Sequence, residues 1–384
     1  MITGSKELIR DINAHLVLET ILNEGPISRA TIASKLGLTK ATISAIVSSL
    51  IEQQLVQEIG SDDTSLGRKP ILISFCKESG YVISIDLGVD TIYILCSDLK
   101  ANHCSLKQYP NHYNHNSILS GLKKIIQESI DTLPASPFGV VGISIAIHGV
   151  VDHNEATFTP YYAYEGIPFD SELFAQFQIP VYLENEANLS ILSEKVFCHN
   201  MANMIGISIH SGIGIGIIIE NKLYTGFNGN AGEFGHSIVV AGGRPCPCGN
   251  QGCLEQYASE RAILRDYAAT KGLNSVDVDT FIAGCIDKDN DALDMLNQFV
   301  KYMSVGINNL LNVFNPEMIV INSSFTMNLP YIIPEITASL KNRMNKHCTL
   351  VPSGLQDSSI LMGGICVCIK NFLGIDSLDL SNHK

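Results

Sequence analysis

The sequence predicts an α/β protein in which a small winged helix-turn-helix domain precedes a larger, two-lobed α/β body. Three observations predict this fold class. Helical apolar spacing interrupted by glycine turns fills the first 50 residues, two later stretches share a strand–glycine–strand pattern, and 384 residues suffice for two or three domains. We expect a winged helix-turn-helix domain at 1–78, a first lobe at 79–195, and a second lobe at 196–384 whose C-terminal helix packs back on the first lobe.

The head should contain three helices followed by two short strands. A Gly-Pro pair ends the first helix, and Gly37 separates the second from the third. Ser28 and Thr39 are suitable N-caps for the second and third helices, since a short side-chain oxygen can accept a free backbone N–H there. The expected elements are helices at 8–22, 27–36 and 39–50 and strands at 55–56 and 71–73.

Polar side chains on the third helix and cations in the loop between the strands are suited to DNA. Lys40, Thr42 and Ser44 lie off the apolar stripe, from which they could reach base edges and phosphates in a major groove. Arg68 and Lys69 would sit on the wing turn, where they suit the phosphate backbone or a minor groove. The alternative is a structural or protein-binding module with a solvated basic turn. The helix-turn-helix pattern and the basic turn occur at the separation that a winged helix requires, and together they favour DNA binding.

The body begins at Gly80 and contains two similar stretches. Residues 81–98 and 205–220 each run strand, glycine turn, strand, and further strands are expected at 139–147, 180–185 and 317–322. This repetition indicates two related α/β lobes with a cleft between them, where small ligands usually bind. No long linker separates head from body, so we expect the two to couple mechanically.

Composition limits the class of protein. The net charge is −13, and it is uneven: residues 1–80 hold eight Lys and Arg against nine Asp and Glu, and the rest hold 17 against 29. Contact with nucleic acid should therefore be confined to the head. Apolar runs fall short of the roughly 18 residues that cross a membrane, and charges interrupt the first dozen positions, so we expect a cytoplasmic protein. Eleven cysteines, an odd number, do not suggest a disulfide framework.

Four residues have the spacing of a closed zinc site. His236 precedes Cys246, Cys248 and Cys253, the last three in the pattern Cys-x-Cys-Gly-x-x-Gly-Cys. Three thiolates and one imidazole complete a tetrahedral structural site and leave no position open for catalysis. The alternative is that these are free buried cysteines, but free cysteines rarely lie this close together in a sequence. We predict one structural Zn²⁺ per chain.

Acids and amides lie close to these ligands or at a strand end. Asn185 and Glu186 end a strand and start a helix, the edge at which α/β folds place ligand-binding groups. Glu233 and Glu255 each lie within three residues of a zinc ligand, so the metal would hold both in place. Such a cluster suits the hydroxyls of a sugar, although each acid alone could be a surface charge. Glycines at 88, 212, 214 and 216 could cradle phosphates or simply form tight hairpins.

The order of these motifs resembles the ROK family of sugar kinases and sugar-responsive repressors over essentially the whole chain. Within the family it is most similar to the repressors that respond to xylose in Gram-positive bacteria. The resemblance implies an actin-like, ribonuclease H-like body, a structural zinc and a sugar in the cleft. It also implies that the sugar-contact positions are Asn185, Glu186, Glu233, His236 and Glu255.

Departures from the kinase pattern are as informative as the match. ROK kinases have Asp as catalytic base where this chain has Glu186, whose extra methylene would misplace a base. Asp90 would put negative charge beside the nucleotide phosphates, and Asn322-Ser323-Ser324 replaces a double glycine. We therefore expect no catalytic residue and no kinase activity.

The sequence predicts a sugar-responsive repressor, with xylose or a related monosaccharide as effector, that is released from a palindromic operator in double-stranded DNA when sugar binds. It should act as a dimer or a dimer of dimers and should not bind membranes. Two alternatives stay open. One is a ROK sugar kinase with a DNA-binding head, and the other is an orphan regulator with an altered ligand, suggested by Tyr161–Tyr164 where the family usually offers Asn and Trp.

Overall fold

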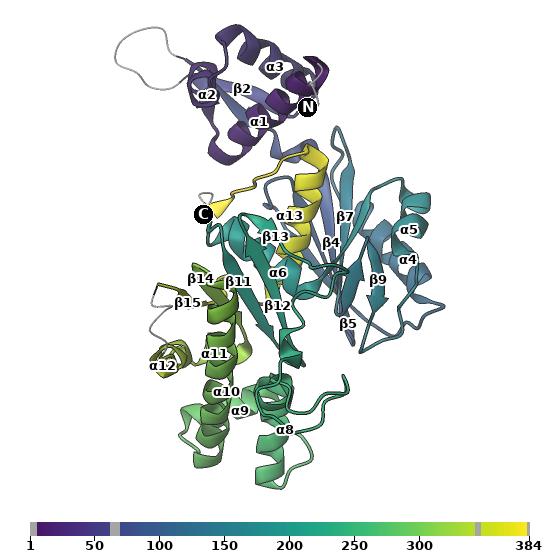
Figure 1. Cartoon of the computed structure of the whole chain (residues 1–384). Helices are drawn as coiled ribbons and strands as arrows, with labels where there is room; N and C mark the ends of the chain where they lie inside the picture. The colour runs from purple at the N-terminus through teal and green to yellow at the C-terminus, as the bar shows by residue number, and fades with distance from the viewer. Residues whose placement is uncertain (1–5, 62–69, 342–346, 382–384) are drawn as a thin grey trace. The chain divides into compact units, whose positions relative to one another are not determined.

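A computed structural model describes residues 6–61, 70–341 and 347–381 (Figure 1). The chain divides into two compact units, one made of residues 1–149, 154–184 and 364–384 and the other of residues 150–153 and 185–363. The head and the first lobe thus belong to the first unit. The longer segment of the second unit starts at Asn185, whereas the sequence predicts a second lobe from residue 196. The predicted domain bounds stay predictions.

The head has the expected three helices and wing strands. Ser28 Oγ accepts the backbone N–H of Thr31 at the start of the second helix, and Thr39 Oγ1 accepts that of Thr42 at the start of the third, both at 3.1 Å. Its elements are α1 (Lys6–Glu24), β1 (Ile27–Ser28), α2 (Arg29–Leu36), α3 (Lys40–Glu52), β2 (Val56–Ser61) and β3 (Ile71–Phe75). The expectation that Ile27 opens a helix is wrong, because β1 pairs antiparallel with β3 and the sheet runs β1-β3-β2.

The first unit contains a five-stranded sheet in the order β10-β7-β4-β5-β6. Strand β4 pairs antiparallel with β5 and parallel with β7, and its side chains are almost all buried. The strands are β4 (Tyr81–Leu87), β5 (Thr91–Asp98), β6 (Ser105–Pro110), β7 (Val140–Ile147) and β10 (Val181–Asn185); the helices are α4 (Ile118–Ile130) and α5 (Phe169–Phe177), with the short turn η1 (Lys77–Ser79) before β4. A separate hairpin joins β8 (Val150–Asp152) to β9 (Glu155–Phe158).

The second unit repeats this sheet as β13-β12-β11-β14-β15. Strand β11 pairs antiparallel with β12 and parallel with β14, as β4 does with β5 and β7. This equivalence confirms the internal repeat predicted from the two strand–glycine–strand stretches. The strands are β11 (Met204–Ile209), β12 (Ile213–Ile219), β13 (Lys222–Leu223), β14 (Met318–Asn322) and β15 (Thr349–Pro352).

Helices pack around this second sheet, and a large apolar cluster that includes Phe281, Phe299 and Phe325 forms between the helices and the sheet. The helices are α6 (Glu186–Phe197), α7 (Glu255–Ala258), α8 (Glu260–Lys271), α9 (Val278–Ile286), α10 (Asn290–Phe314), α11 (Ser324–Asn328) and α12 (Ile332–Ser339), with short turns η2 (Phe234–His236) and η3 (Gln356–Ser358).

Two of the glycines that the sequence analysis placed at the centre of the second hairpin lie instead within strand β12. A Cβ added at Gly216 would come within 2.4 Å of Ile191 Cγ2 and 2.5 Å of the Ala187 carbonyl oxygen. Gly214 likewise faces Ala187. Glycine at these positions therefore lets α6 lie directly against β12.

The last helix, α13 (Ser359–Leu373), belongs to both units: its first five residues lie in the second unit and the rest in the first. Phe372 near its C-terminal end packs edge-on against Phe138, with ring centroids 5.2 Å apart. Within the described parts of the chain, every helix is too short or too polar to cross a bilayer.

Candidate metal centre and ligand-binding residues

The four predicted metal ligands come together on one loop system after β13. His236 ends the short turn η2, and the following segment returns on itself through antiparallel bridges that pair Ile238 with Cys253 and Pro245 with Gln251. A Cβ at Gly252 would lie 1.7 Å from the Val240 carbonyl oxygen, so this fold-back requires glycine there. The ligand atoms of the four residues, His236, Cys246, Cys248 and Cys253, all lie within 4.8 Å of one another.

These distances fit a tetrahedral metal ion. Cys248 Sγ lies 3.6 Å from Cys253 Sγ, and Cys246 Sγ lies 3.5 Å from His236 Nδ1. Zinc bonds of about 2.3 Å to sulfur and about 2.0 Å to nitrogen would separate ligands at tetrahedral angles by roughly 3.5–3.8 Å. The four side chains could hold a metal ion, and the set of three thiols and an imidazole is the kind that zinc prefers.

The pKa values of the three thiols determine what must happen when a metal binds. Burial raises the pKa of Cys246 and raises that of Cys253 to about 12. Burial also opposes ionisation of Cys248, but hydrogen bonds from the Asn250 backbone and the neighbouring thiols outweigh it and lower the Cys248 pKa. Without a cation, two of the three sulfurs therefore keep their protons. Because a metal binds thiolates, its binding should release protons.

Two carboxylates flank the imidazole. Glu255 Oε1 lies 3.9 Å from His236 Nδ1 and 3.3 Å from Cys246 Sγ, whereas Glu233 Oε2 lies 3.7 Å from His236 Nε2. Desolvation raises the pKa of Glu233, with His236 opposing and Glu255 adding to the rise. With Nδ1 facing the thiols, Nε2 and Glu233 remain on the side away from them, where they can offer a donor and an acceptor to a hydroxyl group.

Two residues that were not predicted from the sequence, Gln256 and Arg244, support this loop. Gln256 Nε2 donates to Glu255 Oε1 at 3.1 Å and so orients the buried carboxylate. Arg244 donates to Asp266 at 2.6 Å and to the Gln256 carbonyl at 2.9 Å, and its guanidinium stacks on Tyr257 at 4.8 Å. The supporting role of Gln256 could have been predicted from its position next to Glu255. The pairing of Arg244 with Asp266 could not, because 22 positions separate the two residues in the sequence.

Asn185 and Glu186 stand together at the start of α6. Asn185 is the N-cap: its Oδ1 accepts the backbone N–H groups of Ala187 and Asn188 at 2.9 and 3.1 Å. Its Nδ2 donates to Glu186 Oε2 at 2.6 Å. The Asn185 oxygen is therefore used in capping the helix, and this capping fixes the direction of its amide nitrogen and of the Glu186 carboxylate.

Strand β12 joins these two groups of residues. Glu186 Oε1 lies 3.6 Å from the Cβ position of Gly214 in β12, and Gly232, just before Glu233, accepts the backbone N–H of Ile215 in the same strand at 3.0 Å. The structure thus places carboxylate oxygens of Glu233 and Glu255 at 3.7 and 3.9 Å from the His236 ring nitrogens. It sets Glu186, which is hydrogen-bonded to Asn185, against strand β12.

A buried carboxylate, that of Glu260, binds Ser323 and Ser324, which stand where ROK kinases have a double glycine. Glu260, 6% exposed at the start of α8, accepts the backbone N–H of Ser324 at 2.6 Å and the hydroxyl of Ser323 at 2.8 Å. The Ser324 hydroxyl donates to its other oxygen at 3.2 Å. This segment is therefore already paired with an internal anion.

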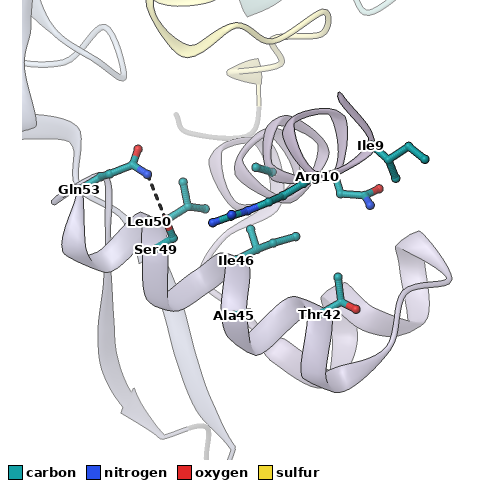
Figure 2. Close-up of a pocket in the computed structure, with 10 residues that line it drawn as sticks. Ile9, Arg10, Thr42, Ala45, Ile46, Ser49, Leu50 and Gln53 are labelled. Atoms are coloured by element: carbon teal, nitrogen blue, oxygen red, sulfur yellow. Dashed lines mark hydrogen bonds between the residues drawn. The ribbon is translucent and has the colours of Figure 1, made fainter. Parts of the chain in front are cut away.

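The predicted DNA-contacting side chains differ in their availability. Lys40 and Ser44 on α3 are exposed, whereas Thr42 is half-buried, and its hydroxyl pairs with that of Thr39 at 2.8 Å. Thr42 lines a cavity of about 350 Å³ between α1 and α3, together with Arg10, Ile46 and Gln53. Figure 2 shows these side chains. Arg68 and Lys69 lie outside the described residues.

Fold and site together define a winged-helix regulator built on a sugar-kinase-like body. A profile described as ROK family matches residues 82–370, and a second, described as MarR family, matches residues 11–64. The chain belongs to the ROK family.

Individual relatives agree with this assignment. The chain is 35% identical to the xylose repressor of Bacillus spizizenii over 97% of this chain and 98% of that protein. Its structure matches a ROK family transcriptional regulator, a homologue of the E. coli MLC protein, with a TM-score of 0.85 and 27% identity over 95% of this chain and 96% of the other. A Streptomyces griseus ROK glucokinase matches at TM-score 0.66 and 23% identity over 75% of this chain and 99% of its own, which shows a shared fold.

Proposed function

We propose that this chain is a sugar-responsive transcriptional repressor that binds a palindromic operator and is released by xylose or a related monosaccharide. The observation that carries this proposal is the combination, in one chain, of a MarR-type winged helix with a ROK body in which the carboxylates of Glu233 and Glu255 flank a metal-ligand cluster. The name of its Bacillus relative supports xylose as the first sugar to test.

The sugar contacts are assigned to Asn185, Glu186, Glu233, His236 and Glu255. Glu233 and His236 Nε2 form an acceptor and a donor side by side. Glu186 adds a second carboxylate, held by Asn185 at the N-terminus of α6. A sugar hydroxyl both donates and accepts, so an array of carboxylates with an imidazole N–H suits it.

We assign a structural zinc to His236, Cys246, Cys248 and Cys253, one per chain. The ion would neutralise the thiolates and hold the loop that carries Glu233 and Glu255. With all four positions filled by protein ligands, it would supply structure rather than a reactive site.

Operator contacts are assigned to Lys40, Thr42 and Ser44 on α3 and to the wing residues Arg68 and Lys69. The Thr42 hydroxyl also pairs with that of Thr39, the N-cap of α3. A palindromic operator matches a dimer or a dimer of dimers, since each half-site takes one head. The net charge of −12 outside residues 1–80 supports confinement of DNA contact to the head.

Kinase activity should be absent. Glu260 places a buried negative charge on Ser323 and Ser324, where a phosphate would have to displace it. Asp90 adds a further negative charge in the first hairpin, and the longer side chain at Glu186 would misplace a catalytic base.

The rival function is a sugar kinase with a DNA-binding head. The two are separated by incubating the purified protein with ATP and a panel of pentoses and hexoses and measuring ADP release. The repressor should release no sugar-dependent ADP, and the same sugars should raise its melting temperature if they bind the folded state. Sugar-dependent turnover would support the kinase; a panel in which no sugar shifts the melting temperature would support an orphan regulator with another ligand.

A further inference from the structure

The C-terminal segment after α13 lies along helix α1 of the head. The Cβ position of Gly374 is 3.0 Å from the His15 ring, Glu19 follows one turn later and Asn23 one turn after that. The segment therefore runs parallel to α1, although the two lie more than 350 positions apart in the sequence.

Two side chains of α1 bind the backbone of this segment. Glu19 Oε2 accepts the N–H groups of both Asp376 and Ser377 at 3.1 Å. Asn23 donates from Nδ2 to the Ser377 carbonyl at 3.2 Å and accepts the Asp379 N–H at Oδ1 at 3.0 Å. Asn23 thus pairs with both a donor and an acceptor of the segment, as a neighbouring strand would.

Apolar side chains of the same segment are buried. Ile375, Leu378 and Leu380 are 5%, 6% and 3% exposed. Four hydrogen bonds between its backbone and side chains of α1, together with three buried apolar side chains, hold this segment in place.

At its other end, α13 packs on α6, the helix that begins at the proposed sugar contact Glu186 and is capped by Asn185. Ser359, the first residue of α13, accepts hydrogen bonds at its hydroxyl from Ser190 of α6 at 3.0 Å and from Asn322 at 3.1 Å. The Cβ position of Gly363 is 2.0 Å from the carbonyl oxygen of Leu189 in α6. One continuous helix therefore starts against α6 and ends in the segment that is bound to α1.

We propose that residues Gly374–Leu380 form a strap that holds the DNA-binding head, and that α13 transmits the sugar-bound state of α6 to the head through this strap. The proposal rests on the sugar-responsive repressor function. The head is also joined to the first lobe near Ser79, whose hydroxyl donates to the Gln54 carbonyl at 2.5 Å. One attachment leaves the head free to rotate; a second, on α1, fixes its orientation, which sets the spacing of two heads on an operator.

The test uses the full chain carrying Glu19→Ala and Asn23→Ala, which remove all four hydrogen bonds to the strap without emptying the core. The control is Asn371→Ala, an exposed residue of α13 whose side chain bonds the Val367 carbonyl of its own helix. Hydrogen exchange should show the amides of Asp376, Ser377 and Asp379 protected in the native chain and in the control, and at least ~10-fold faster in the double variant.

The second readout is operator affinity with and without xylose. The native chain and the control should change affinity by a factor within the roughly 5- to 150-fold range of ordinary coupling, and the double variant by less than about 2-fold, with sugar affinity retained. Unprotected strap amides in the native chain would overturn the strap. A double variant with a freed strap and a native sugar response would overturn its part in coupling. A native chain that ignores every sugar would refute the repressor function instead, and the exchange result alone would then decide the strap.

Discussion

Nε2 of His236 lies 3.7 Å from the carboxylate of Glu233, while Nδ1 of the same ring faces the thiol of Cys246. One imidazole thereby joins the metal-ligand cluster to a proposed sugar contact. A metal held at Nδ1 would fix the ring, and with it the direction of Nε2. Metal binding and sugar binding should therefore fail together.

Replacing Cys248 by Ser tests this link. We expect the variant to lose its zinc and to bind sugar more weakly by at least ~10-fold, because Glu233 and Glu255 lose their common support. Elemental analysis and sugar titration of the purified variant measure both. Cys104→Ser, at an exposed cysteine remote in sequence from the cluster, is the matched control. Full sugar affinity in a zinc-free Cys248→Ser protein would contradict the link.

The wing is tested through the salt dependence of operator binding. Arg68→Ala should weaken binding and reduce the slope of log affinity against log salt concentration by about 0.9 for each phosphate that the variant no longer neutralises. Lys124→Ala removes an exposed cation from α4 in the body and should leave both quantities unchanged. An Arg68→Ala protein with native affinity and slope would show that the wing does not touch DNA.

The contact between α6 and β12 predicts the effect of a single methyl group. Gly216→Ala would force its Cβ against Ile191 and the Ala187 carbonyl, so α6 must shift and carry Glu186 with it. We expect a loss of about 1–3 kcal/mol in the free energy of unfolding, measured by denaturant titration, and weaker sugar binding. Gly60→Ala, where a Cβ meets nothing within 4 Å, should change neither. A variant as stable as the native chain would argue against this close packing.

Local signals in the sequence were sufficient for much of the fold. The N-caps at Ser28 and Thr39 and the repeated hairpins depend on neighbouring residues, and the structure confirms them. The spacing of the four metal ligands likewise placed them together correctly. What the sequence analysis missed depends on partners far along the chain: Ile27 pairs with Ile73, and Glu19 with Asp376.

The same distinction applies to the site. Gly214 and Gly216 of β12 were predicted to lie in a turn. A glycine-rich run looks the same in a sequence whether it forms a turn or a strand that packs closely against a helix. Only the position of α6, unknown from the sequence, separates the two cases. The pairing of Glu260 with Ser323 and Ser324 was out of reach for the same reason, since 63 positions separate the acid from the first serine.

The central claim is that sugar binding alone, without chemistry, weakens operator binding. The most direct measurement is an operator titration with and without xylose and other pentoses and hexoses, in the absence of ATP, on the native chain and on Glu186→Ala. We expect one sugar to weaken operator affinity of the native chain by roughly 5- to 150-fold, and operator to weaken sugar binding by the same factor. Glu186→Ala should bind operator normally and ignore the sugar. An affinity that no sugar changes, or that changes only when ATP is added, would contradict the account.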